Sequence, residues 1–420
     1  MSTTALDQIT YDDLYARWER GNWRATEIDF SEDRVHWHER FGEIERKAAL
    51  WNYSLFLHGE DSVADNLSPY IDAAPREEHK YFLATQQVDE ARHAVFFGRF
   101  MREVVERGDS YASSLAATEP ELTWGFRRVF ARLDRMAEEL RRDRSRPMLA
   151  RGIMLYHIII EATLAQPGQH FIESYLQDRG LMPGFQAGMK NVALDEQRHI
   201  GFGVKLLSEL IADDTEAREA SLELLSEMVP SAVAVFVPPD WDRRYTECFG
   251  FTLEEIYAEG TQSVWTKLRT AGFTEEEIAR SMRLRADLTP EERAARAITL
   301  LQANVLGEGI APPSTDPEIM GLFFETMADA VDPRHSPERP VTIQWDFKDA
   351  EPWHLRIDNG STSAQAGRAP DPDLTFRCRF GDWVDVASGR ADARRSLVTG
   401  RIRPKGSLKL LWRSQHLFGR

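Results

Sequence analysis

The chain has 420 residues, of which 42% are hydrophobic and 10% aromatic, and its formal net charge at pH 7 is -16. This length predicts two domains, and the negative charge disfavours nucleic acid and anionic membrane surfaces, although it leaves room for local basic patches. The two cysteines, Cys248 and Cys378, are too few for a disulfide framework, a cysteine-rich zinc site or an iron–sulfur cluster.

The amino-terminal stretch MSTTALDQITYDDLYARWER has neither a basic start nor an apolar run. No stretch of the chain approaches twenty uninterrupted apolar residues, which is the length that a membrane-spanning helix needs. We therefore expect a cytoplasmic protein without integral membrane association. Any metal must be held by carboxylates and imidazoles.

Up to about residue 306 the sequence predicts helices, because apolar residues recur at three- and four-residue spacing between breaks at Pro and Gly. The longest predicted helices cover residues 31–59, 76–107, 122–142, 147–177, 184–212 and 215–228. This part of the chain is therefore expected to be all-α.

A linker rich in Gly, Pro and Ser follows at 307–318. Beyond one more amphipathic helix the pattern changes to strands, with an Asn-Gly turn signal at 359–360, and the chain closes with a short strand and a helix within 396–418. We expect an all-α domain over residues 1–310 and a small α+β domain over residues 311–420.

A charged motif occurs twice, in TQQVDEARHAVFF (85–97) and in VALDEQRHIGF (192–202). Glu90 and His93 are three residues apart on one predicted helix, and Glu196 and His199 repeat that spacing, so each pair shares a helix face. A lone Glu-x-x-His on a helix is most often part of the solvated surface. The duplication is what favours a metal site.

Each pair has a partner glutamate on the preceding predicted helix. Glu60 lies 30 residues before Glu90 and Glu161 lies 35 before Glu196, and both intervals have helix breakers at their midpoints. Each half therefore predicts one helical hairpin, and packing the two hairpins together brings four glutamates and two histidines into a bundle core. This pattern predicts a carboxylate-bridged site for two metal ions, because four buried carboxylates require cations or protons.

The remaining charged residues of the motif surround the predicted ions. Asp89 and Asp195 are expected to orient the imidazoles across the helix pair, and Arg92 and Arg198 to offset the acidic surplus. Oxygen-rich ligation with one imidazole per ion suits iron and manganese. We expect two Fe ions, with a Mn/Fe pair as the alternative.

At these residues the chain resembles the ferritin-like superfamily, in the branch of the ribonucleotide reductase small subunit, its ligand-binding oxidase relatives and the bacterial di-iron monooxygenases. The resemblance covers roughly residues 11–230 and includes the stretch WERGNWRATEIDFSEDRVHW. It implies a ferritin-like four-helix bundle. The ligands that it implies are Glu60, Glu90, His93, Glu161, Glu196 and His199.

Three positions depart from relatives with this motif. Phe97 stands where the radical-forming reductase subunits have a tyrosine, which argues against a stored tyrosyl radical. Val192 replaces a histidine of the arylamine N-oxygenases, and Ala165 replaces a threonine of many di-iron hydroxylases. The resemblance therefore favours another oxidase or oxygenase, in which proton delivery takes a different route.

Two residues before Glu161 are candidate catalytic residues. Tyr156 stands where the ligand-binding oxidases carry a tyrosine that can cross-link near the metals, and the alternative is an ordinary core aromatic. His157, one turn before Glu161, is either a residue that supports the ligands, a ligand itself, or a packing or solvent residue, as individual histidines such as His58, His79 and His170 are expected to be.

The segment LYHIIIEATLAQPGQHF (155–171) is apolar around its single glutamate, with small residues at Ala162, Ala165 and Gly168. It is suited to lining an apolar substrate cavity, which a helix distortion at Pro167 would widen. Close helix packing explains the same small residues equally well.

Residues 316–420 resemble the sterol carrier protein type 2 fold through DLTFRCRFGDWVDVASGRADARRSLVTGRIRPKGSLKLLWRSQHLF. That family shields apolar molecules between sheet and helices, and burying ten methylenes would stabilise a complex by about 8 kcal/mol before ordering costs. A dimerisation or scaffold module is the alternative.

We therefore expect a dioxygen-dependent di-metal oxidoreductase that hydroxylates, desaturates or otherwise oxidises an apolar or partly apolar small molecule. The sequence contains no flavin, haem or iron–sulfur motif, so electrons are expected from a separate reductase, a ferredoxin or the substrate. The oligomeric state that we consider for this protein is a homodimer. The alternative function is a metal-containing lipid-binding protein without oxygen chemistry.

Overall fold

The computed structural model describes residues 9–418, except for the side chains of Pro167, Phe171, Gln415 and His416. The chain forms two compact units: the first contains the residues up to 221 together with 235–272, and the second contains 222–234 together with the residues from 273 onward. The structure groups the helices after residue 273 with the second unit. The domain boundary at residue 310 stays a prediction.

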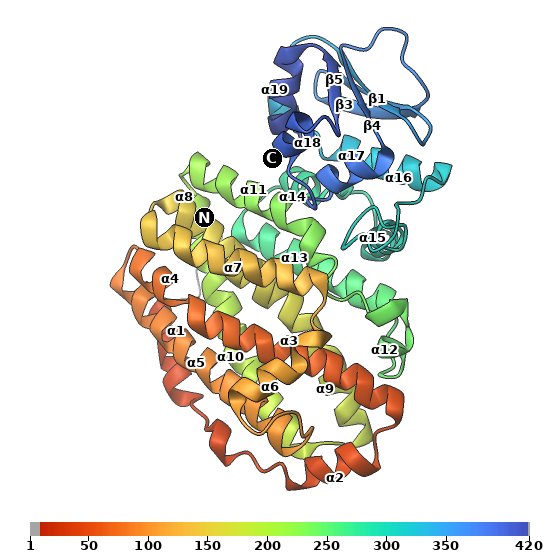
Figure 1. Ribbon diagram of the computed structural model, residues 1–420. Coiled ribbons are helices and arrows are strands. Elements are labelled where there is room, and N and C mark those ends of the chain that lie inside the picture. The colour runs from red at the N-terminus through yellow and green to blue at the C-terminus, as the bar shows by residue number, and fades with distance from the viewer. Residues whose placement is uncertain (1–8, 419–420) are drawn as a thin grey trace. The chain divides into compact units, whose positions relative to one another are not determined.

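The described residues of the first unit form helices and loops without strands (Figure 1), as the sequence predicts. The helices before residue 272 are α1 (Tyr11–Arg20), η2 (Ala25–Glu27), α2 (Ser31–Glu39), α3 (Glu43–Asn66), α4 (Ser68–Ala73), α5 (Glu77–Glu103), α6 (Tyr111–Thr118), η3 (Glu119–Glu121), α7 (Trp124–Arg142), α8 (Arg146–Ile153), η4 (Met154–Ala165), α9 (Gln166–Arg179), α10 (Pro183–Ile211), α11 (Thr215–Ala232), η5 (Pro239–Trp241), α12 (Arg244–Glu247) and α13 (Leu253–Ala271).

The first predicted hairpin consists of α3 and α5, which pack against each other. The helix predicted over 31–59 is instead two helices, because Gly42 is extended (φ -71°, ψ 172°). The backbone N–H of Gly42 donates to the Glu45 carboxylate at 2.6 Å, which caps the start of α3. Restarting the helix at this point lets α3 continue to Asn66 and so carry Glu60 in its interior.

The second hairpin consists of the continuous run α8, η4 and α9, followed by α10. The twelve residues of η4 are wound as a π-helix, where the sequence predicts an ordinary α-helix. Pro167 lacks the N–H that would bond the Ala162 carbonyl five residues earlier, and the Ser263 hydroxyl donates to that carbonyl instead, at 2.7 Å. The distortion therefore precedes Pro167, whose own side chain lies outside the described part.

An aromatic core fills one end of this bundle. Phe96 and Phe100 of α5 contact Phe185 of α10, with ring centroids 5.7 Å and 4.4 Å away, and Tyr53 of α3 packs 4.8 Å from the same ring. A Cβ on Gly188 would lie 2.1 Å from the Phe96 ring. Glycine at this position therefore permits the close approach of α5 and α10.

The second unit contains a five-stranded sheet in the order β3-β2-β1-β4-β5, in which β1 pairs parallel to β4 and the other pairs are antiparallel. Its strands are β1 (Val341–Phe347), β2 (Trp353–Asp358), β3 (Ser361–Ala366), β4 (Leu374–Cys378) and β5 (Arg403–Gly406). The predicted turn between β2 and β3 is confirmed, since Asn359 and Gly360 both have positive φ, 49° and 83°.

Helices accompany this sheet, as an α+β domain requires (Figure 1). They are α14 (Glu275–Met282), α15 (Pro290–Gln302), α16 (Pro317–Asp329), η6 (Pro333–His335), α17 (Phe380–Ala387), α18 (Ala393–Val398) and α19 (Leu408–Leu417). Phe324 of α16 stacks on Trp353 of β2 with ring centroids 5.0 Å apart, and Trp383 of α17 packs on Trp345 of β1 at 5.1 Å. The sheet is thus anchored to its helices by aromatic pairs.

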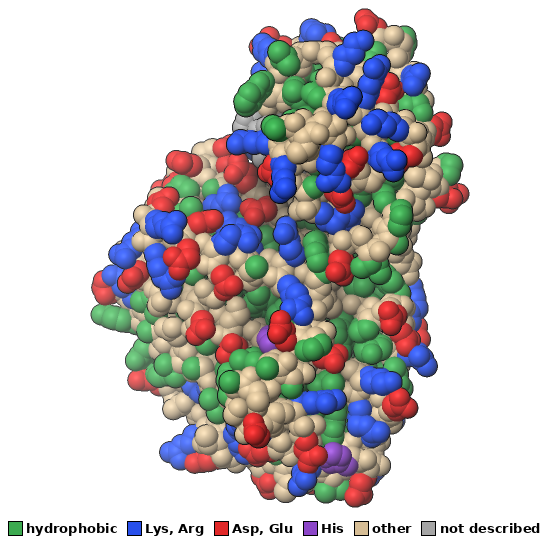
Figure 2. Space-filling model, in the orientation of Figure 1, with side chains coloured by type: hydrophobic (Ala, Val, Ile, Leu, Met, Phe, Trp, Pro, Cys, Tyr) green, Lys and Arg blue, Asp and Glu red, His purple; other side chains and the backbone are tan. Residues whose placement is uncertain are grey.

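The visible surface carries acidic and basic side chains interspersed with isolated apolar ones (Figure 2). By length and composition the run Arg146–Arg179 is long and apolar enough to cross a membrane, yet 72% of its most apolar window is buried inside the protein. This run contains Glu161 in the interior of the first unit. Its hydrophobicity is therefore that of a core helix.

Candidate metal centre

The six predicted ligands meet in the interior of the first unit. Glu60 comes from α3, Glu90 and His93 from α5, Glu161 from η4, and Glu196 and His199 from α10. All six are buried, and the most exposed of them, Glu60, has only 7% of its surface accessible. Six residues separated by up to 139 positions in sequence thus converge where the two hairpins pack together.

The ligand atoms form two groups, in each of which one atom per residue lies within 4.8 Å of all the others. The first group is Glu60, Glu90, His93 and Glu196, and the second is Glu90, Glu161 and His199. Glu90 belongs to both groups. A carboxylate placed in this way can bridge two ions, which is the arrangement expected of a two-metal site.

Both imidazoles present Nδ1 to the carboxylates. His93 Nδ1 lies 3.2 Å from Glu60 and 3.6 Å from Glu196, and His199 Nδ1 lies 3.2 Å from Glu90 and 3.7 Å from Glu161. The opposite ring nitrogen of each histidine contacts an aspartate of the other hairpin: His93 Nε2 is 3.1 Å from Asp195, and His199 Nε2 is 3.1 Å from Asp89.

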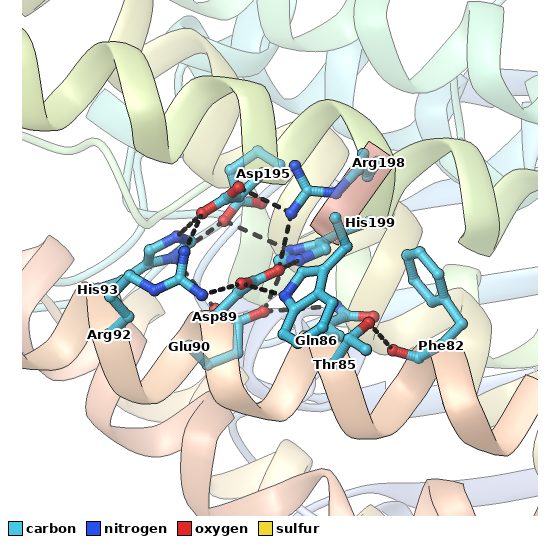
Figure 3. A network of polar contacts seen from close by, with 12 residues as sticks. Phe82, Thr85, Gln86, Asp89, Glu90, Arg92, His93, Asp195, Arg198 and His199 are labelled. Carbon is cyan, nitrogen blue, oxygen red and sulfur yellow. Dashed lines mark hydrogen bonds and ion pairs between the residues drawn. The ribbon is translucent and has the colours of Figure 1, made fainter. Parts of the chain in front are cut away.

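The aspartates therefore act crosswise, each on the histidine of the opposite half (Figure 3). In a neutral imidazole, an Nε2–H that donates to a carboxylate leaves Nδ1 unprotonated, so this pairing selects the tautomer that can bind a metal through Nδ1. The structure brings Asp89 and Asp195 into contact with the imidazoles, and their role toward bound metal stays a prediction.

The two arginines of the motif link these aspartates. Arg198 Nη2 donates to Asp89 at 2.8 Å and to Asp195 at 2.7 Å, and Arg92 Nη2 donates to Asp89 at 2.8 Å. Arg92 also lies over the Trp23 ring, 5.4 Å from its centroid. The guanidinium groups thus balance the aspartates, and they do not enter either ligand group.

Two tryptophans complete the surroundings, and sequence reasoning did not identify their role. Trp18 Nε1 donates to Asp89 at 2.9 Å, and Trp23 Nε1 donates to Asp195 at 2.8 Å. Both belong to the quoted stretch WERGNWR, so the resemblance pointed to the segment. No local pattern indicates which carboxylates these indoles reach, because their partners lie 71 and 172 positions away.

Burial and mutual charge shift the titration of the ligands. Burial raises the pKa of Glu60 to about 7 and that of Glu196 to about 8, and burial together with the charge of Glu196 raises the pKa of Glu161. Burial also opposes charge on Glu90, but the two imidazoles outweigh it and hold its pKa well below its usual range. The shared glutamate is therefore the carboxylate that stays ionised most readily.

Tyr156 and His157 both lie near the ligand groups without belonging to them. The Tyr156 hydroxyl donates to Glu90 at 2.7 Å, and the amide of Gln86 donates to Glu161 at 2.8 Å and to Tyr156 at 3.2 Å. His157 contacts Gln86 at 3.1 Å, and burial lowers its pKa to about 3. His157 is thus placed as a neutral neighbour of Gln86, and the catalytic role of either residue stays a prediction.

The other histidines that the sequence singled out lie outside the two ligand groups. His58 contacts the Thr118 hydroxyl at 3.0 Å, and His79 contacts Arg76. Their environments are those of packing residues, as the sequence predicts.

The residues at the centre fit a pair of cations. Glu161 Oε2 and Glu196 Oε2 are buried without a hydrogen-bond partner, although buried polar atoms are nearly always satisfied. Four carboxylates and two imidazoles match the formal charge of two divalent ions and the donor preference of iron and manganese. The structure therefore supplies a complete donor set for a two-metal cofactor.

An apolar cavity reaches the same glutamates. Apart from Asn52 and the four glutamates, it is lined by apolar side chains and one glycine from α3, α7, η4 and residues 235–236. Ile160, Leu164 and Ala165 of η4 contribute to this lining, so the segment around Glu161 does border an apolar cavity. Ala162 is fully buried and is not among the lining residues.

Comparison with known proteins assigns both parts of the chain. Residues 4–235 match the family of the ribonucleotide reductase small chain, and residues 337–419 match the SCP-2 sterol transfer family. The first match covers more than half of the chain. The second covers all five strands and the helices α17, α18 and α19 completely, which agrees with the predicted sterol-carrier-like fold.

Solved structures of R2-like ligand-binding oxidase variants share this fold. One with an anaerobically reconstituted Mn/Fe cofactor is 23% identical (TM-score 0.54) over 63% of this chain and 93% of its own. One with an aerobically reconstituted Mn/Fe cofactor is 22% identical (TM-score 0.56), covering 63% and 94%. Another, with an Fe/Fe cofactor, is 22% identical (TM-score 0.55), covering 63% and 93%.

At this identity the solved structures establish a common fold, while the family match covers the residues that carry both Glu-x-x-His pairs and their partner glutamates. The helical order, the buried donor set and the crosswise aspartates all lie within residues 4–235. The chain belongs to the ribonucleotide reductase small chain family.

Proposed function

We propose that the protein is a dioxygen-dependent di-metal oxidoreductase that oxidises an apolar or partly apolar small molecule. The observation that carries this proposal is the contact between the apolar cavity and the glutamates of both ligand groups. A substrate in this cavity would lie beside the metal ligands and away from bulk water. The reaction would be a hydroxylation, a desaturation or a related oxidation.

The cofactor would be two Fe ions or a Mn/Fe pair, as in the solved structures with the same fold. Glu60, Glu90, His93 and Glu196 would hold one ion, and Glu90, Glu161 and His199 the other. When bound, the two ions would supply the binding and reduction of dioxygen. The crosswise aspartates would keep each imidazole in the ligating tautomer.

The protein's own groups would position the reaction and exclude water. The Tyr156 hydroxyl holds the shared carboxylate of Glu90 through its hydrogen bond of 2.7 Å. Gln86 orients Glu161, the carboxylate that the π-helical segment brings to the cavity wall. Electrons would come from a separate reductase, a ferredoxin or the substrate, and the sterol-carrier-like domain would bind an apolar molecule or mediate assembly.

The test is metal content combined with oxygen consumption. The full chain, produced with both iron and manganese available, should contain close to two ions per chain by plasma mass spectrometry, and should consume dioxygen after chemical reduction. Glu196→Ala should lose metal and oxygen uptake, whereas Glu138→Ala, at an exposed position of α7, should lose neither. Two bound ions without oxygen uptake would indicate the alternative, a metal-containing lipid-binding protein.

A further inference from the structure

A second, smaller chamber adjoins the cavity at the glutamates. The two spaces share the side chains of Asn52 and Phe236, which line both. The second chamber also borders Trp51, Tyr245 and Phe249. One amide and one aromatic ring therefore form the boundary between the two chambers.

The second chamber is mostly apolar, and its lining residues with polar side-chain groups are Trp51, Asn52, Tyr245 and Thr246. Trp51 Nε1 and Asn52 Oδ1 are both buried without a hydrogen-bond partner, and only 3% of the Trp51 surface is accessible. One atom is a donor and the other an acceptor. Because an unmade hydrogen bond in a buried site is unfavourable, an unsatisfied donor and an unsatisfied acceptor on two residues that line this chamber point to a ligand that satisfies them.

The spacing along α3 fixes how far apart the two ends of such a ligand would lie. Asn52 and Glu60 are eight residues apart on this helix, which places them on the same face and about 12 Å apart along the axis. Gly168 lies where the chambers meet, since a Cβ there would be 3.4 Å from Phe56 and 3.8 Å from both Asn52 and Phe236. A narrow apolar chain of medium length spans this distance.

The chemistry of the polar end follows from the lining. The described lining residues of the second chamber include no Lys, Arg or His, so an ionised carboxylate or phosphate would have no cation to pair with. A neutral group that both donates and accepts, such as a hydroxyl or a primary amide, matches the two unsatisfied atoms.

We propose that the second chamber binds the neutral polar end of an elongated apolar substrate, through hydrogen bonds to Trp51 and Asn52. The apolar chain of this substrate passes between Asn52 and Phe236 toward the glutamates, so that oxidation occurs at a carbon remote from the polar end. This assignment rests on the proposed oxidase function, because that function defines the end of the substrate that reacts.

Binding of decanol and of decane to the metal-loaded full chain tests the proposal by calorimetry. Wild-type protein should bind decanol more tightly than decane. Asn52→Leu and Trp51→Phe should each lower the affinity for decanol about fivefold, the effect of one lost hydrogen bond, and should leave the affinity for decane unchanged or higher. Trp124→Phe, on α7 and outside both chambers, is the matched control and should alter neither affinity.

Equal affinities of wild-type protein for decanol and decane, no binding of either, or an equal loss for both ligands in Asn52→Leu would overturn the proposal. Failure of the proposed function gives a different result. In that case the preference for decanol and its dependence on Asn52 would persist, while the metal-loaded protein would consume no dioxygen in the presence of decanol or decane.

Discussion

The two hairpins carry the same ligand pattern on differently built helices. Four residues before its first glutamate and four after its histidine, the first hairpin has Phe56 and Phe97, which stack with ring centroids 5.4 Å apart. The second hairpin has His157 and Gly203 at the corresponding positions, and a Cβ on Gly203 would lie 2.1 Å from His157. The duplicated motif therefore repeats the ligands, while their surroundings differ.

The two hairpins also differ in helix type and in the side chains beside their ligands. The first hairpin is regular α-helix with an aromatic stack beside its ligands. The second is π-helical around Glu161 and carries the polar neighbours Tyr156 and His157. π-Helical segments are rare and are frequently found at functional sites. The comparison teaches that the two halves differ in helix type and in the neighbours of their ligands, although residues of both α3 and η4 line the cavity.

The strongest test of the shared pattern is the loss of Glu90, the glutamate of both ligand groups. Glu90→Ala should remove both ions, because each group loses a carboxylate, and should abolish oxygen uptake. Glu60→Ala, which affects only the first group, should retain more metal than Glu90→Ala. Plasma mass spectrometry on the purified chains measures both. Equal retention in the two variants would show that Glu90 does not bridge the ions.

The crosswise aspartates allow the two halves to be perturbed separately. Asp195→Asn should weaken the ion held through His93, and Asp89→Asn the ion held through His199, each by about 10–100-fold in affinity. Competition with a chelator, followed by metal analysis at substoichiometric loading, measures this loss. A double variant with His93→Ala shows which ion Asp195→Asn affects. If Asp195→Asn weakened binding of the ion held through His199, the crosswise assignment would be wrong.

Protonation of the ligands should make metal uptake depend on pH. With the pKa of Glu60 near 7 and that of Glu196 near 8, both carboxyls hold protons in the metal-free protein below these values. Metal must displace these protons, so affinity should rise with pH up to about 8, by about tenfold per pH unit for each proton displaced. Manganese titrations at pH 6 and pH 8 measure this change. Affinity that falls as pH rises would contradict the raised pKa values.

The sequence predicts the centre well because its information is local and duplicated. The spacing of Glu90 and His93 on one helix, repeated in Glu196 and His199, determines two ligand faces, and helix breakers at the midpoints determine two hairpins. The all-α and α+β fold classes follow from the change of period between the two parts of the chain.

The features that sequence reasoning missed depend on contacts between distant segments. The π-helix of η4 involves Ser263, about a hundred residues later, because its hydroxyl takes the place of the N–H that Pro167 lacks. Trp18 reaches Asp89 across 71 positions. The cavity wall includes Phe236 from a region with no visible motif. The periodicity of apolar residues within one segment does not predict contacts with such distant segments.

The smallest expected effect concerns the close contact that distinguishes the second hairpin. Gly203→Ala should destabilise the protein by about 1–3 kcal/mol, because the added methyl group would overlap His157 and force η4 away from α10. Gly201→Ala, on the same helix with no atom within 4 Å of the new Cβ, is the matched control. It should be neutral or stabilising by up to about 1 kcal/mol, as Ala is favoured over Gly in helices. Urea unfolding of both variants measures the difference in their free energies of unfolding. Equal stabilities would mean that η4 moves to accommodate the added methyl group, and that the packing of His157 on α10 does not hold the π-helix in place.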